Sequence, residues 1–498
     1  MRGKGLLLFA AFSFFVAMSI VNICRKPPYV GGDAAQYIII AKSLSQGQGF
    51  RMVNYPSAPG ARIAPLLPLV LAAVYKLCGE NIFCFRLIIF CFGLGTAVVF
   101  YRLFAARLQY ETTDVFFLLS LFLSRLFFVY NFRILTDVPF MFLAGLSFLF
   151  FKKYQDSDSV VNKYGILTLL FSLFTYFCRY IGVLVLLAIV AALLADRKRL
   201  SRKKVLFLCL LFLPLPLAWE IRNLAVKTSY SSSFMKQFSY IDWYKPYLGT
   251  ILQNPFLFFS RVWNNLVFYS LLLGGNFLFS FLGIKLPLVV RCLFSALIVG
   301  MLIKGILAEE NVWRNSVLIF SVLYFISILA WPFREDGRYF LPLLPFTAVC
   351  IWRGVEVTFR KRIKTIYAVL SVFMLTRAVF AYSAVSGVFP YYHNVSPAVR
   401  NFFYINKWLE RNIPAGKIIA SRKPRITYFY SGHKSMAYPF SKDPALIWRF
   451  LERHRIKYLI VDNFSRETYL YIAPFLQKYR ARLKLIYRIG NTGLFRIE

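Results

Sequence analysis

Residues 6–37 read LLLFAAFSFFVAMSIVNICRKPPYVGGDAAQY, an apolar segment followed by a short polar linker and a carboxylate at Asp33. A membrane-spanning helix needs about 20 mostly apolar residues, and the stretch from Leu6 to Ile23 is long enough. Because no small-residue cleavage site follows, we expect a retained helix with a cytoplasmic N-terminus rather than a cleaved signal peptide. Asp33 then lies just outside the membrane, where a carboxylate can act as a base on a substrate delivered from the lipid.

The composition is that of an integral membrane protein. Hydrophobic residues make up 59% of the chain and aromatic residues 19%, more than soluble domains contain. Much of the net charge of +39 lies in short loops between apolar segments, which indicates membrane topology; we recognise no nucleic-acid-binding module, so we exclude nucleic acid as a partner. The eight cysteines lie in or beside apolar segments without a CxxC spacing, so we expect neither a disulfide framework nor a Cys/His zinc site.

The apolar segments predict a polytopic α-helical protein with about eleven transmembrane helices. The expected spans are 6–23, 82–104, 115–130, 138–153, 164–177, 181–195, 205–222, 288–307, 314–332, 339–355 and 364–385. With the N-terminus inside, the densest basic clusters between spans all fall on the cytoplasmic side, as the positive-inside rule requires. The outer side then holds the loops 24–81, 131–137, 223–287 and 333–338 and the chain from about 386.

Two apolar segments do not fit this layout as full spans. Residues 63–77 are short and contain two prolines, so we interpret them as a helix that lies on the membrane surface or dips into it. Residues 255–285 are rich in aromatic side chains but interrupted by Asn264-Asn265 and by Gly274-Gly275-Asn276. They are either interfacial or a shallow hairpin.

The C-terminal part changes character after the last span. Residues 402–412, 444–455 and 467–480 are typical of amphipathic helices, and residues 417–420, 458–462, 482–489 and 493–497 are typical of strands. Such alternation predicts a small α/β domain. We therefore divide the chain into a membrane domain, 1–389, and an extracytoplasmic α/β domain, 390–498.

Two carboxylates lie at helix ends on the outer side of this layout. They are Asp33 and Asp137, the latter in the sequence RILTDVP at 133–139. Each could be a simple helix cap, because Asp is favoured at that position. Two carboxylates at the same membrane boundary nevertheless favour a shared catalytic role over two separate caps.

Four outer-side arginines could bind an anionic lipid phosphate, because a guanidinium group offers two parallel hydrogen bonds to phosphate oxygens. They are Arg62, Arg222, Arg334 and Arg338. An alternative for the last two is a local ion network with Glu335 and Asp336. Arg179 lies between two apolar segments, and we expect it to anchor them at the interface.

Several short motifs together resemble a known enzyme group. They are GDAAQY at 32–37, TDVP at 136–139, WEIRN at 219–223 and RYFLPLLP at 338–345, with ASRKPR at 420–425 and SKDP at 441–444. In this combination the chain resembles the bacterial GT-C glycosyltransferases, in particular the protein O-mannosyltransferase-like and lipid A aminoarabinose transferase-like enzymes.

The resemblance implies a GT-C fold in a bacterial inner membrane and a defined reaction. Such enzymes transfer a sugar, with inversion, from a polyprenyl-phosphate carrier to an acceptor on the outer face. By motif, Asp33 matches the catalytic aspartate, Asp137 the auxiliary acid, and Arg62 and Arg338 the carrier-phosphate contacts. The acceptor, whether lipid, glycan or protein, is left open.

Further candidate substrate-binding residues are Tyr37, Arg222 and Arg334. No cofactor is assigned. A divalent metal ion, if one binds, would lie at Asp33 and Asp137, although the second motif holds one carboxylate rather than an Asp-x-Asp pair. The sequence of the Pro65–Pro68 segment, PLLP, departs from the aminoarabinose enzymes, which weakens lipid A as the expected acceptor. The alternative functions are a transporter or flippase of lipid-linked substrates, which would place charges near the membrane midplane, and a non-catalytic scaffold.

Overall fold

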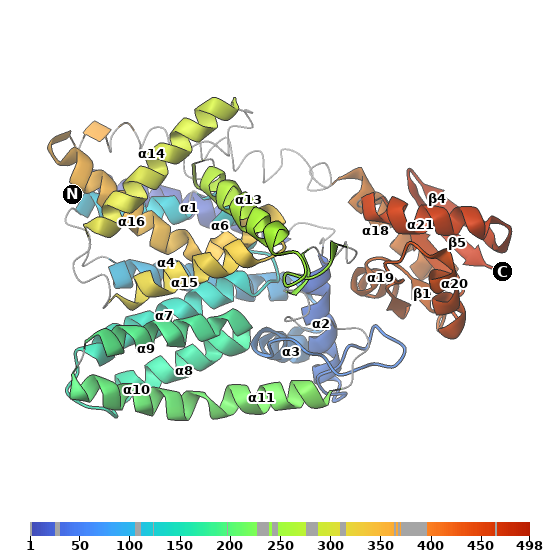
Figure 1. Cartoon of the computed structure of the whole chain (residues 1–498), viewed down its shortest axis with the longest axis horizontal. Helices are drawn as coiled ribbons and strands as arrows, with labels where there is room; N and C mark the ends of the chain where they lie inside the picture. Colours follow the sequence, from blue (N-terminus) through green and yellow to red (C-terminus); the bar gives the residue numbers. More distant parts are fainter. Residues whose placement is uncertain are drawn as a thin grey trace.

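The protein is a bundle of helices with a small mixed α/β unit at one end (Figure 1). The computed structural model describes residues 2–24, 30–104, 111–122, 124–196, 198–226, 239–241, 248–274, 287–308, 315–362, 365–366, 369, 396–463 and 466–498. The N-terminus lies at the end of the bundle away from the C-terminal unit, which comprises residues 396–463 and 466–498 (Figure 1). The predicted boundary at 389 and 390 falls outside the described residues.

The bundle helices follow the apolar segments of the sequence. They are α1 (Arg2–Cys24), α4 (Ile82–Phe104), α5 (Glu111–Phe122), α6 (Arg125–Tyr130), α7 (Asp137–Gln155), α8 (Lys163–Cys178), α9 (Val183–Ala195), α10 (Arg199–Phe212), α11 (Pro214–Ala225), α13 (Pro255–Gly274), α14 (Leu288–Leu307), α15 (Ser316–Ala330) and α16 (Leu344–Phe359). Among the described helices, five are long and apolar enough to cross a membrane when Arg199–Ala225 and Gly337–Phe359 are each counted as one continuous helix, and five further apolar helices are shorter. Ten of the eleven expected spans coincide with helices; the eleventh, 364–385, lies almost entirely outside the described residues.

Two shorter helices come from the first loop of the chain. They are α2 (Gly32–Ser45) and α3 (Leu66–Cys78). The second confirms a helix over most of 63–77, and it begins after Pro65 because proline is tolerated at the start of a helix and not in its interior. Helix α2 lies on the side of the bundle that faces the C-terminal unit (Figure 1).

Several segments differ from their expected form. The span expected at 205–222 is divided into α10 and α11, and that at 339–355 begins in the 3-10 helix η6 (Glu335–Leu343). The span expected at 115–130 is divided into α5 and α6, and Ser124 caps α6 by accepting a hydrogen bond from the backbone N–H of Phe127. Conversely, α13 runs without interruption through Asn264 and Asn265. The Asn265 side chain donates to the carbonyls of Leu329 and Trp331 at 2.8 and 2.9 Å, so it satisfies the end of α15 instead of breaking its own helix. Residues 275–285 of the expected hairpin lie outside the described residues.

Close helix contacts hold the bundle together. Helices α14 and α16 cross where Gly305 meets the Cys350 carbonyl, and a Cβ atom on that glycine would lie 1.8 Å from the carbonyl oxygen. A Cβ atom on Gly354 would lie 1.9 Å from the carbonyl oxygen of Met301. Small residues at such crossings let helix backbones approach closely, which is how helices associate in lipid.

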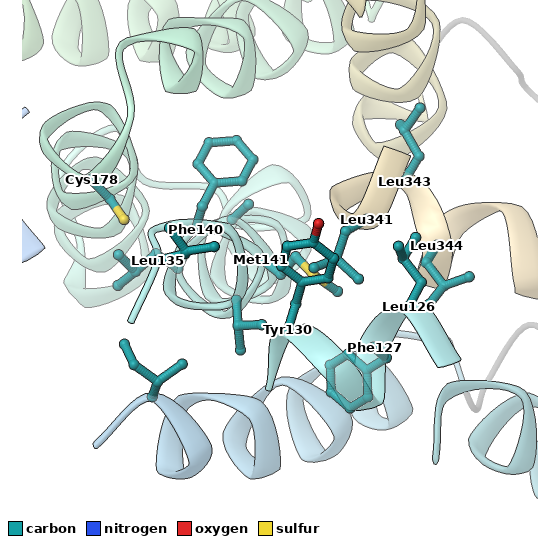
Figure 2. Packing of buried hydrophobic residues seen from close by; sticks show 14 of the residues in the cluster. Leu126, Phe127, Tyr130, Leu135, Phe140, Met141, Cys178, Leu341, Leu343 and Leu344 are labelled. Carbon is teal, nitrogen blue, oxygen red and sulfur yellow. The ribbon is translucent and has the colours of Figure 1, made fainter. Parts of the chain in front are cut away.

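An apolar cluster packs α6, α7 and η6 together. Figure 2 shows side chains from α6, α7, η6 (Glu335–Leu343) and the segments beside them packed together, among them Leu126, Phe127, Tyr130, Leu135, Phe140, Met141, Leu341 and Leu343. Asp137 begins α7 and Arg338 lies in η6, so this packing holds the two elements that carry these charged residues against each other.

The C-terminal unit contains the expected small mixed sheet. Its strand order is β2-β1-β3-β5-β4, with β1 parallel to β2 and β3, and β5 antiparallel to β3 and β4. The strands are β1 (Ile419–Ala420), β2 (Ser435–Met436), β3 (Tyr458–Val461), β4 (Leu483–Ile489) and β5 (Thr492–Ile497). The helices are α18 (Pro397–Asn412), α19 (Pro424–Ser431), α20 (Pro444–Arg453) and α21 (Arg466–Lys478). Helix α19 and strand β2 were not among the elements predicted from the sequence.

The C-terminal unit shares a hydrophobic core with the first loop of the chain. Met52 and Tyr55 from that loop are buried in one cluster with Ala420, Met436 and Ile447 of the unit. Backbone contacts reinforce this packing, because Ser435 N–H donates to the Asn54 carbonyl at 2.8 Å and Val30 N–H donates to the Tyr430 hydroxyl at 2.6 Å. The unit is therefore packed directly over the segment that carries Asp33.

Candidate active site

Asp33 lies in the first turn of α2, where the helix dipole favours negative charge. The residue that caps α2 is Gly31, with no side-chain hydrogen bond, so Asp33 is not a simple cap. Its Oδ2 atom accepts a hydrogen bond from Nη1 of Arg338 at 2.7 Å, and 42% of the side chain is exposed. Its Oδ1 atom makes no hydrogen bond to the described residues and faces Nη1 of Arg425 at 3.9 Å.

Asp137 is the first residue of α7 and is fully buried. The capping position is held by Thr136 without a side-chain hydrogen bond, so the cap interpretation fails here too. Oδ1 of Asp137 accepts from Nη1 of Arg179 at 2.5 Å, and Oδ2 accepts from Nε of Arg338 at 2.8 Å. Both oxygens are engaged by arginines, which is how a buried carboxylate is made tolerable.

Arg338 connects the carboxylates. Its side chain is 8% exposed, and it donates to Asp33, to Asp137 and, at 2.8 Å, to Oε2 of Glu335. The chain turns sharply just before it, with φ of +35° at Glu335 and +83° at Gly337. The left-handed region is strained for a residue with a side chain. This turn places Arg338 between loops that are far apart in the sequence.

The charges of this network set the protonation of Asp33. Desolvation by the surrounding protein would raise the pKa of Asp33, but the Arg338 guanidinium, with help from Arg425 and Lys423, outweighs it and holds the pKa below its usual value. Asp33 is therefore ionised at neutral pH. Burial, followed by the charge on Asp33, raises the pKa of neighbouring Tyr37 to about 12, so its hydroxyl remains a hydrogen-bond donor.

The other arginines identified in the sequence lie outside this network. Arg62 donates to the carbonyl of Val226, and Arg222 donates to the carbonyl of Ala61 at 2.5 Å. These two hydrogen bonds tie the first loop to the end of α11. Arg334 donates to Oδ1 of Asn265 at 2.8 Å. The structure thus brings together Asp33, Asp137, Arg338 and Tyr37, and it places Arg62, Arg222 and Arg334 in contacts between loops and helices.

Four charged residues of the site were not assigned a site role from the sequence. Arg179 pairs with Asp137 instead of acting as the expected interface anchor. Glu335 was considered only as a local ion-pair partner, whereas its Arg338 contact joins the larger network. Arg425 and Lys423 belong to the ASRKPR motif at 420–425. That motif contributed to the family resemblance, but nothing in it indicates that it folds back over Asp33.

A metal ion does not fit between the two aspartates. The Arg338 guanidinium already occupies the position from which a cation would contact both Asp33 and Asp137. Within the described part of the chain, no group of three or more His, Cys, Asp or Glu side chains is arranged to hold a metal ion. The positive charge at this site comes from arginine.

An apolar pocket of about 210 Å³ lies beside η6. It is bounded by η6 and helices α13, α14, α15 and α16, and its lining includes Leu273, Phe325, Phe340 and Phe346. Phe340 is two residues from Arg338, so the pocket begins close to the charged network. Leu273 is the residue that α13 contributes to this lining.

Comparisons with known proteins agree on one group. Residues 62–219 match the family described as dolichyl-phosphate-mannose-protein mannosyltransferase. The search of curated proteins gave no significant match. The structure of ArnT from Cupriavidus metallidurans bound to undecaprenyl phosphate is 13% identical, with a TM-score of 0.59 over 99% of this chain and 97% of that one. The apo structure of ArnT gives 14% identity and a TM-score of 0.60 over 99% and 98% of the two chains.

A more distant relative has the same fold. The archaeal oligosaccharyltransferase AglB from Archaeoglobus fulgidus, in complex with an inhibitory peptide and a dolichol-phosphate, is 11% identical, with a TM-score of 0.57 over 98% of this chain and 74% of that one. At these identities the structural likeness shows a common fold, and the family match covers less than half of the chain. The chain is a multi-pass membrane protein with the fold of ArnT and AglB, and its residues 62–219 resemble the dolichyl-phosphate-mannose-protein mannosyltransferase family.

Proposed function

We propose that this enzyme transfers a sugar from a polyprenyl-phosphate carrier to a hydroxyl group of an acceptor on the extracytoplasmic side of a bacterial inner membrane. The observation that carries the proposal is the state of Asp33. The carboxylate is ionised and 42% exposed, one oxygen is held by Arg338, and the other makes no hydrogen bond to the described residues. A carboxylate held in this way can receive a proton from an acceptor hydroxyl.

The proposed reaction is a single inverting displacement. The acceptor oxygen bonds to the anomeric carbon while the bond from that carbon to the phosphate oxygen breaks. The bonding electrons leave with the polyprenyl phosphate, and the hydroxyl proton passes to Oδ1 of Asp33. Arg338 can stabilise the leaving phosphate through Nη2, which makes no hydrogen bond to the described residues.

Asp137 has a positioning role in this proposal. Both of its oxygens are taken by Arg179 and Arg338, so it acts on the substrate only through the arginine that it orients. Arg62, Arg222 and Arg334 remain proposed substrate contacts, although each now donates to another part of the protein.

Two further features support a lipid-linked donor. Phe340 lines the apolar pocket beside η6 and follows Arg338 by two positions. An isoprenoid chain could therefore enter the pocket while its phosphate stays at the charged network. The structures with the same fold include one bound to undecaprenyl phosphate. The proposed orientation follows from the basic loops, and the C-terminal unit, at the end of the bundle away from the N-terminus, is then extracytoplasmic.

The test is transfer from a polyprenyl-phosphate-linked sugar in reconstituted membranes, with wild type compared against Asp33→Asn. We expect a loss of at least about 100-fold, the size expected for removing a general base, with the melting temperature maintained. A matched control is Glu80→Gln, because Glu80 is another half-exposed carboxylate near the first loop, 3.1 Å from Lys42. Equal transfer by Asp33→Asn and wild type would refute the catalytic assignment. Movement of the lipid-linked sugar without transfer would favour the transporter alternative.

A further inference from the structure

The C-terminal unit brings positive charge to the active site. Helix α19 packs against α2, and the hydrogen bond from Val30 N–H to the Tyr430 hydroxyl joins α19 to the residue two positions before α2. Lys423 precedes α19 and Arg425 lies in its first turn. The dipole of the helix adds partial positive charge at this end.

Neither Lys423 nor Arg425 makes a hydrogen bond through its charged group to the described residues, although Arg425 lies within ion-pair distance of Asp33. Nη1 of Arg425 is 3.9 Å from Oδ1 of Asp33, which is too long for a hydrogen bond. The Lys423 ammonium group makes no hydrogen bond or ion pair to the described residues, although its side chain is half-buried. Burial, followed by the charge of neighbouring Arg422, lowers the pKa of Lys423. The charges of Asp462 and Asp33 partly offset this effect. Neither carboxylate accepts a hydrogen bond from the ammonium group, so an anionic ligand that did so would stabilise the half-buried charge.

The numbers of positive and negative groups around Asp33 also favour an anionic ligand. Three carboxylates meet at the site, Asp33, Asp137 and Glu335, and Arg338 and Arg179 already bind them. The addition of Arg425 and Lys423 brings the cations to four, one more than the carboxylates, and Arg422 and Asp462, which also act on Lys423, add one charge of each sign. The surplus charge lies on the side of Asp33 that the C-terminal unit covers, where the open Oδ1 atom faces Arg425.

We propose that Lys423 and Arg425 form an anion-binding site over Asp33, that its ligand is a phosphate group, and that the C-terminal unit is thereby part of the active site. The inference rests on the proposed function for the source of that phosphate. It is either the phosphate of the lipid carrier or a phosphate carried by the acceptor. Arginine and lysine together suit it, since the first binds two phosphate oxygens and the second acts as a point charge.

The experiment measures binding and not turnover, so that it is independent of the choice of sugar and acceptor. The full-length protein in lipid nanodiscs is titrated with undecaprenyl phosphate and with neutral undecaprenol. We expect the wild type to prefer the phosphate lipid, and Arg425→Gln and Lys423→Met each to reduce that preference about tenfold. Arg496→Gln, an exposed residue of β5 in the same unit, removes the same charge and should leave the preference unchanged.

A second measurement separates the two phosphate sources. If the variants keep the wild-type preference for undecaprenyl phosphate but lose thermal stabilisation by inorganic phosphate, the site takes a phosphate on the acceptor. Arg425→Lys keeps the charge and should retain most of either effect, which guards against a loss caused by misfolding. The inference is overturned if both variants match Arg496→Gln in both measurements. A wild type without preference for the phosphate lipid contradicts the carrier in the proposed function, and the inorganic phosphate measurement still decides this inference.

Discussion

Removal of Arg338 tests the carboxylate network directly. Arg338 is 8% exposed and Asp137 is fully buried, 2.8 Å away, and loss of one partner from a buried ion pair costs about 3–5 kcal/mol. The contacts of Arg338 with Asp33 and Glu335 add little, because those carboxylates are 42% and 48% exposed and solvent screening limits each to about 1 kcal/mol or less. Since Arg179 still pairs with Asp137, we expect Arg338→Gln to lower the free energy of unfolding by about 3 kcal/mol.

A double-mutant cycle measures the interaction free energy between Arg338 and Asp137. Arg338→Gln, Asp137→Asn and the double variant are unfolded in mixed micelles by increasing the SDS fraction, and the three losses of stability are compared with wild type. We expect the double variant to lose about 2 kcal/mol less than the sum of the single losses, because neither Arg338 nor Asp137 is then left without the other. Arg179 loses its carboxylate in both Asp137→Asn and the double variant, so that loss cancels in the cycle. An exposed pair, Lys407 and Glu410 at 2.9 Å, serves as control, with an expected coupling below about 0.5 kcal/mol. Additive losses for Arg338 and Asp137 would refute the reasoning.

Three further outcomes follow from other contacts. Lys204→Met should lower the melting temperature in detergent, because the buried ammonium donates to three carbonyls at the end of α7 at 2.6 to 3.2 Å, and unsatisfied buried groups cost about 1–3 kcal/mol each. Gly305→Ala should reduce folding yield because its Cβ would meet a backbone carbonyl of α16, whereas Gly300→Ala on the same helix, with no atom within 4 Å, should not. Because the pKa of Asp33 is lowered, the transfer rate should stay constant as pH falls from 7 and decline only below the usual carboxylate range. Arg425→Gln should shift that decline to higher pH, and an unchanged acid limb would contradict the electrostatic coupling.

The helices of the bundle could be predicted from the sequence because the bilayer demands long apolar segments with internal hydrogen bonds. Local composition was less informative where tertiary contacts decide. The asparagine pair in 255–285 suggested a break, but Asn265 finds its partners on α15, which a window of sequence cannot show. The division between α5 and α6 at Ser124 likewise depends on a single capping hydrogen bond.

Some residues of the candidate site could be predicted from local sequence, and others depend on tertiary contacts. Asp33 and Asp137 could be identified because a carboxylate at a membrane boundary is unusual, and their positions match known motifs. Arg179 could not be identified, because its ion pair joins residues 42 positions apart, and a basic residue between two apolar segments has the same local pattern whether it anchors or binds. Arg338 was predicted to contact the carrier phosphate, and in the structure it forms ion pairs with Asp33 and Asp137.

The packing of the C-terminal unit against the first loop fixes the distance between its charged residues and Asp33. A unit on a flexible tether would give Arg425 no fixed distance from Asp33. Here Met52 and Tyr55 of the first loop are buried in one core with Met436 of the unit, and separation would expose that core to water at a cost of about 1.5–3 kcal/mol for each large side chain. The same loop continues from α2, the helix that carries Asp33. The core that holds the unit in place therefore also holds α19 against α2, and the two ends of the chain form one site.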